Sequence, residues 1–117
     1  MSRLRLVIDT NVLVSALLIG SSLPARLLLL WREGRFDLVT SAEQLAELAR
    51  VTRYPKIRER LPPTLADQLL GELRRLAIVV DELPAVTVST DPHDGYLLAM
   101  AMAGEAAFLV SGDKRDL

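Results

Sequence analysis

Short apolar runs alternate along this chain with longer segments in which apolar residues recur at helical spacing. These runs, apolar except for Arg5, Asp37 and Thr87, are residues 4–8, 36–39, 77–80, 86–88 and 107–110. They are partly β-branched and are bounded by polar or turn residues, as buried strands are. Strands that alternate with helices predict a three-layer α/β/α domain with a mostly parallel central sheet. We expect residues 1–117 to form this single domain.

Capping signals bound the helical segments. The expected helices cover residues 12–18, 24–32, 42–51, 64–76 and 91–103. Ser41, with Gln44 three residues later, is a capping-box pattern. Gly34 and Gly104 follow the expected ends of two helices, where glycine is frequent. Pro55 is expected to break the helical pattern after residue 51.

The overall composition narrows the class of protein. The chain has 117 residues, enough for one domain, and its 50% hydrophobic content argues against disorder. Every apolar run, that of residues 27–31 included, is far shorter than a membrane span. The chain has no cysteine, and its start lacks a secretory signal. We therefore expect a cytoplasmic protein without disulfides or a membrane segment.

Four acidic residues stand where one element gives way to the next. Asp9 ends the first apolar run, and Asp113 follows the last run by two residues. Glu47 and Asp94 lie in helical segments. Ligands of parallel sheets bind beyond the carboxyl ends of the strands, where Asp9 and Asp113 are expected. If the four side chains converge, they form an oxygen-ligand site for a divalent metal ion.

Electrostatics explains why such a pocket would take up a cation. Two carboxylates about 4 Å apart repel by roughly 4 kcal/mol at an effective dielectric near 20. Either some pKa values rise or a cation enters. Oxygen ligands favour Mg²⁺ or Mn²⁺ over zinc or copper. Such an ion can activate water and stabilise the leaving oxygen when a phosphodiester is hydrolysed.

Each acid also has an ordinary explanation. Asp9 could cap the helix that follows it, and Glu47 could be an exposed helix residue. Asp94 could be the reciprocal partner of an Asp91 cap, and Asp113 could be a turn residue. Taken singly, Glu47 favours the ordinary interpretation. Their joint placement favours a common site.

Basic residues cluster in the middle of the chain, although the net charge is only −1. The cluster consists of Arg50, Arg53, Lys56, Arg58 and Arg60, opposed only by Glu59. A basic stripe beside an acidic cleft suits an enzyme that acts on RNA, and we expect Arg50, Arg53, Lys56 and Arg58 to bind it. A solvated helix face is the alternative.

The motifs together resemble the PIN-domain ribonucleases over essentially the whole chain. The resemblance rests on residues 7–13 (VIDTNVL), 41–48, 91–94 (DPHD) ahead of 97–101, and 110–117 (VSGDKRDL). The first and last motifs are fairly specific in combination. Within that family the chain resembles bacterial proteins described as toxin components of toxin–antitoxin pairs.

This resemblance implies a Rossmann-like sheet and a Mg²⁺- or Mn²⁺-dependent endoribonuclease. Position by position, the family's acidic quartet corresponds to Asp9, Glu47, Asp94 and Asp113, and an additional acid of some members corresponds to Asp116. Asp9 and Asp94 would hold the principal ion, Asp113 would help to position it or a second ion, and Glu47 would align or deprotonate water. Polar positions that orient ligands or the attacking water correspond to Thr10, Asn11 and Ser111.

The chain departs from the family pattern at two places. Gly95 follows Asp94 where the family often has Asn or a charged residue. The sequence stops at Leu117, whereas family members usually continue through a short helix and a further strand. Without that last strand, a hydrophobic sheet edge would be unpaired. Either the sequence is truncated or a partner covers the edge.

The resemblance also suggests partners. An antitoxin peptide lying across the cleft would hold a toxin in check. The segment 27–31, with Leu17 and Leu18, could form the surface of a homodimer, and burial in the core is the alternative.

Two other classes of α/β protein fit the sequence less well. A phosphorylated receiver domain needs an acceptor Asp near mid-chain, and residues 53–56 contain none. A haloacid-dehalogenase-like phosphatase needs an Asp at position 11, where Asn11 stands. A non-catalytic RNA- or protein-binding module on the same fold is the stronger alternative, and loss of catalysis in Asp9→Asn would separate it from an enzyme.

Overall fold

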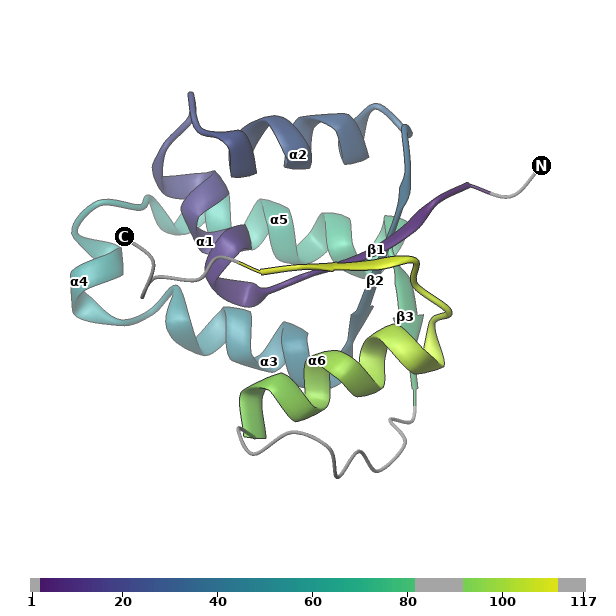
Figure 1. Ribbon diagram of the computed structural model, residues 1–117. Helices are drawn as coiled ribbons and strands as arrows, with labels where there is room; N and C mark the ends of the chain where they lie inside the picture. Colours follow the sequence, from purple (N-terminus) through teal and green to yellow (C-terminus); the bar gives the residue numbers. More distant parts are fainter. Residues whose placement is uncertain (1–2, 82–91, 112–117) are drawn as a thin grey trace.

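The computed structural model describes residues 3–81 and 92–111, and within these all side chains except those of residues 92–95. Its strands are β1 (Arg5–Ile8), β2 (Asp37–Ser41), β3 (Ile78–Val80) and β4 (Phe108–Val110). In this part of the chain they form one sheet of order β3-β2-β1-β4, and every adjacent pair is parallel (Figure 1). The predicted parallel sheet is confirmed.

The strand order reverses at β1. The chain progresses outward from β1 through β2 to β3, and it then returns to place β4 on the other side of β1. In an open parallel sheet such a reversal leaves a crevice beyond the carboxyl ends of the two strands that flank it. Here these ends are Ile8 and Val110, which are paired in register.

Helices cover both faces of the sheet. One face carries α1 (Thr10–Leu18), α2 (Leu23–Arg32), α3 (Ala42–Val51) and α5 (Pro63–Leu76). The other face carries α6 (Pro92–Ala103), which packs against β1, β2 and β4 (Figure 1). The arrangement is the predicted three-layer α/β/α domain.

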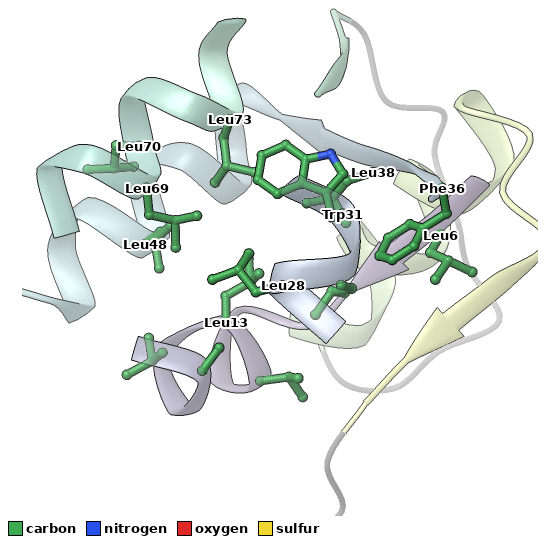
Figure 2. Packing of buried hydrophobic residues seen from close by; sticks show 14 residues of the cluster. Leu6, Leu13, Leu28, Trp31, Phe36, Leu38, Leu48, Leu69, Leu70 and Leu73 are labelled. Carbon is green, nitrogen blue, oxygen red and sulfur yellow. The ribbon is translucent and has the colours of Figure 1, made fainter. Parts of the chain in front are cut away.

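Two apolar clusters hold the layers together. Figure 2 shows Trp31 and Leu28 of α2 close to side chains from α5 and from the sheet, among them Leu73 and Leu38. On the opposite face, Val7 and Val39 are fully buried against Leu97 and Met100 of α6. Successive strand residues point to opposite faces. Both faces are covered, which explains why consecutive residues are apolar in the central strands, Leu6–Ile8 in β1 and Leu38 and Val39 in β2.

Most helix boundaries agree with the expectations from sequence. Helix α3 begins and ends as predicted, and α1 begins at Thr10, before the expected Val12, because Asp9 caps it. The helical pattern is interrupted after Val51, as expected, but the helix that follows the break was not predicted. Pro55 opens a further short helix, α4 (Pro55–Arg58), since proline fits the first helical position. The expected strand at 86–88 lies outside the described residues.

The two helix-ending glycines have different roles. Gly34 has φ +79° and donates its N–H to Trp31 O, so it occupies the left-handed position that ends α2. At the end of α6 the left-handed residue is Glu105, with φ 53°. Gly104 is instead required by close packing, since a Cβ there would lie 2.5 Å from Val39 Cγ1.

The leucine-rich helix α2 is divided between core and surface. Leu28 and Trp31 are buried, whereas Leu29 and Leu30 are 53% and 42% exposed. No single helix in the described part of the chain is long and apolar enough to cross a membrane. Helices α1 and α2 together have the length and apolar composition of a membrane span, but their axes are bent by 97° at the break between them.

Strand β4 lies at one edge of the described sheet. Its first residue, Phe108, is 62% exposed. An apolar edge of this kind can pair with another strand.

Candidate functional site

Asp9 lies at the point where the strand order reverses. Its backbone N–H donates to Val110 O at 2.8 Å, which ties the end of β1 to the end of β4. One carboxylate oxygen, Oδ1, accepts from the Asn11 N–H at 3.2 Å and caps α1. The other, Oδ2, accepts from the Ser111 hydroxyl at 3.3 Å. Asp9 is therefore both a helix cap and part of the crevice.

Glu47 is held below the surface of α3. Its side chain is only 11% exposed, so the interpretation of Glu47 as an ordinary exposed helix residue does not apply. Glu47 Oε1 accepts from the Tyr96 hydroxyl at 2.6 Å. Glu47 Oε2 lies 3.8 Å from Arg50 Nη2, one helical turn away. A short bond from a neutral donor fixes one oxygen, and the second oxygen faces a cation.

The Thr10 side chain points inward, toward Tyr96 and Gln44. It is 2% exposed, and its hydroxyl lies 3.2 Å from the Tyr96 hydroxyl and 3.5 Å from Gln44 Nε2. Asn11, the next residue, is exposed. The two polar residues predicted to orient ligands or water therefore occupy different environments.

Gln44 connects this cluster to the sheet. Its Nε2 donates to Ile8 O at 2.7 Å, and its Oε1 accepts from the Thr40 hydroxyl at 2.7 Å. The Ser41 hydroxyl accepts from the Gln44 backbone N–H at 3.2 Å, which is the first half of the predicted capping box. The Gln44 side chain donates to the carbonyl at the end of β1, and this takes the place of the second capping-box bond, to the Ser41 backbone N–H.

Sequence reasoning did not identify Tyr96 or the buried role of Gln44. Burial raises the pKa of the Tyr96 hydroxyl above its ordinary value, and the hydrogen bond to Glu47 and the charges of Glu47 and Asp9 raise it further, whereas the hydrogen bond with Thr10 lowers it. Tyr96 therefore stays protonated and remains a donor. The available signals were a lone tyrosine in an apolar helix, and Gln44 one turn before Glu47.

The predicted acidic quartet is described only in part. Asp9 and Glu47 lie close enough to the same tyrosine for both charges to act on it. The Asp94 side chain and residues Asp113 and Asp116 lie outside the described residues. Among the side chains that are described, no group of three or more His, Cys, Asp or Glu could hold a metal ion. The oxygen donors present, two carboxylates and the Ser111 hydroxyl, match the preference of Mg²⁺ or Mn²⁺.

The basic residues lie on the surface, at the end of α3 and in the segment that follows it. Arg50 is in the last turn of α3, and Lys56 and Arg58 are in α4. All of these side chains, and Arg53 between the two helices, are exposed. Among the described side chains, Arg50 pairs with an acid of the predicted site, Glu47, at 3.8 Å.

An apolar groove of about 420 Å³ begins at Ser111. Its walls come from α1, α2 and the end of β4, and they include Val12, Leu23, Leu27 and Leu30. Leu23 is 80% exposed. The crevice residue Ser111 thus also lines an apolar groove, formed here by described residues of α1, α2 and β4.

Comparison with known proteins agrees with this fold. An uncharacterized protein from Methanocaldococcus jannaschii is 26% identical over 113 residues, which cover 96% of this chain and 72% of that protein. The PIN domain family matches residues 5–115, nearly the whole chain. Members of that family are commonly nucleases and typically use divalent metal ions. With its doubly wound parallel sheet and Asp9 at the strand reversal, this chain belongs to the PIN domain family.

Proposed function

We propose that this PIN domain is a Mg²⁺- or Mn²⁺-dependent endoribonuclease. The observation that carries the proposal is the position of Asp9, whose carboxylate lies at the strand reversal with Ser111 and on the same side as Glu47. Buried or half-buried carboxylates near one another are unfavourable unless a cation joins them. An acidic crevice beside exposed arginines is the charge distribution that metal-dependent cleavage of RNA requires.

The proposed site divides the work among its residues. Asp9, with Asp94, Asp113 and Asp116, would hold the cation, and Ser111 would orient Asp9 through the 3.3 Å contact. The cation, when bound, stabilises negative charge on the phosphodiester oxygens. Glu47 would align a water molecule and accept its proton as the water oxygen bonds to phosphorus and the bond to the leaving ribose oxygen breaks. Asn11 is exposed beside Asp9 and would contact water or RNA.

The direct test is cleavage of mixed RNA by the purified chain. We expect cleavage with Mg²⁺ or Mn²⁺, none in the presence of EDTA, and recovery when excess metal is restored. The recovery step distinguishes loss of the ion from damage to the protein. Binding of RNA without cleavage under all these conditions would favour the alternative, a non-catalytic module on the same fold.

The basic stripe gives a separate prediction about RNA binding. Replacing Arg53 and Lys56 together by Ala should weaken binding and lower the slope of log K against log salt concentration by about 1.4, since each cation contributes roughly 0.7 for single strands. Fluorescence anisotropy over a salt series measures this slope. A matched control is Arg74→Ala with Arg75→Ala, two exposed arginines in the last turn of α5. An equal change in the control would mean that the stripe has no special role.

We further propose that the chain acts in the cytoplasm as the toxin of a toxin–antitoxin pair. The apolar groove at Ser111 supports this proposal, because an apolar segment of an antitoxin bound there would reach the acidic crevice.

The second partner that we propose is another copy of this chain, bound through the exposed leucines of α2. A short gene overlapping the start of this one would support the first partner, and the mass of the isolated chain in solution would test the second.

A further inference from the structure

We propose that Tyr96 is the positioning residue for Glu47, and that Thr10 acts on Glu47 only through Tyr96. The kinetic test of this inference rests on the proposed nuclease function. The geometry that supports the inference is independent of that function. The three side chains come from α6, α3 and α1, and they meet under the end of β1.

The hydrogen bonds in this cluster have a defined direction. Ile8 O can only accept, so the nitrogen of the Gln44 amide must face it, and Gln44 Oε1 is left to accept from Thr40. The Tyr96 hydroxyl donates its proton to Glu47 Oε1. Its oxygen must then accept from Thr10 in the 3.2 Å contact. The Thr10 oxygen is in turn 3.5 Å from the Gln44 donor.

The result is a one-way series of donors that ends on Glu47. It runs from the Gln44 amide through the Thr10 hydroxyl to the Tyr96 hydroxyl and the carboxylate. Each hydroxyl donates in one direction and accepts from the other, which polarises the next bond. The 2.6 Å distance between Tyr96 Oη and Glu47 Oε1 is in the range of charge-assisted bonds.

This series also separates the two oxygens of Glu47. Oε1 is occupied by Tyr96, and Oε2 is the oxygen on the side of Arg50, at 3.8 Å. A carboxylate held by one oxygen cannot rotate freely, so its other oxygen keeps one direction.

Thr10 therefore has a different role from the one suggested by its place beside Asp9. Its side chain is 2% exposed and directed at Tyr96 and Gln44. If it acted directly on water or a cation, its loss would matter whether or not Tyr96 had a hydroxyl. If it acts through Tyr96, its loss should matter only when that hydroxyl is present.

A double-mutant cycle distinguishes these two roles. We expect Tyr96→Phe to lower kcat for RNA cleavage about 10–100-fold with little change in KM, as loss of an outer partner does. Thr10→Val, which keeps the shape and removes the hydroxyl, should lower kcat by a smaller factor. Thr10→Ser, which keeps the hydroxyl, should have nearly the kcat of the wild type. In the Tyr96→Phe background, Thr10→Val should have no further effect. The proposal would be overturned if the double variant lost kcat by the product of the two single-variant factors, or if Tyr96→Phe had the kcat of the wild type.

A measurement without substrate keeps this test independent of the proposed function. The ¹³C resonance of the Glu47 carboxyl, identified by its loss in Glu47→Gln, should shift in Tyr96→Phe and in Thr10→Val. It should not respond to Thr10→Val when Tyr96 is already Phe. If the wild type cleaves no RNA but the resonance behaves in this way, the ribonuclease proposal fails and the positioning of Glu47 stands. If the chemical shift of the Glu47 carboxyl changes in neither Tyr96→Phe nor Thr10→Val, the proposal that Tyr96 positions Glu47 is wrong.

Discussion

Asp9→Asn is expected to reduce RNA cleavage by at least about 100-fold while leaving the fold intact. Asparagine keeps an oxygen that can accept from the Asn11 N–H, and Asn caps helices as well as Asp does. It removes the negative charge that a divalent cation needs. Because the charge of Asp9 acts in the same region as that of Glu47, its loss should not destabilise the fold and could stabilise it slightly.

A matched variant separates the two roles of Asp9. Asp9→Ala removes the charge and the cap together, so it should lose cleavage and also about 1 kcal/mol of stability. RNA cleavage and thermal unfolding of the wild type and both variants provide the comparison. An Asp9→Asn protein that cleaves at the wild-type rate would show that Asp9 is only a cap, and one that unfolds would show that the carboxylate is structural. The same loss of cleavage is expected for Asp94→Asn and Asp113→Asn.

Gly104→Ala is expected to destabilise the domain by about 3 kcal/mol. A Cβ at this position would lie 2.5 Å and 2.9 Å from the two methyl groups of Val39 and 3.2 Å from Met100 O. Val39 is fully buried in β2, which has a strand on each side, so its side chain has little room to move. Either α6 must lift from the sheet or β2 must shift. Chemical denaturation measures the loss.

Two further variants show whether close packing is the cause. Val39→Ala removes the methyl groups that would clash, so Gly104→Ala should cost much less in that background than alone. Glu105→Gly, at the next residue, changes a left-handed position with φ 53° and should be neutral or stabilising by up to about 1 kcal/mol. A Gly104→Ala protein as stable as the wild type would contradict the close approach of α6 to β2.

The layer architecture could be predicted from sequence because it depends on local patterns. The apolar run at the start of the chain is buried on both faces, so residues 6, 7 and 8 all had to be apolar. The extent of α3 followed from Ser41, whose hydroxyl does accept from Gln44 N. Pro55 shows where such patterns are ambiguous, since the same residue can end one helix or begin another.

Local patterns were less informative for the ends of α6 and for Glu47. Gly104 suggested a left-handed cap, but the tertiary reason for glycine there is its approach to Val39, and Glu105 has the left-handed conformation. Glu47, taken alone, resembled a surface residue. In the fold its carboxylate accepts a hydrogen bond from Tyr96, which is 49 residues away in sequence.

The sequence by itself determined most of the described strands and helices and that Asp9 follows a buried strand, because hydrophobic spacing and capping act over a few residues. Only the tertiary structure decided that Asp9 meets Ser111, that Tyr96 donates to Glu47, and that Thr10 lies behind that tyrosine. These contacts join residues between 49 and 102 positions apart. The physical reason is that a hydrogen bond forms only when packing brings donor and acceptor to within about 3 Å, and no local pattern specifies that distance between remote elements.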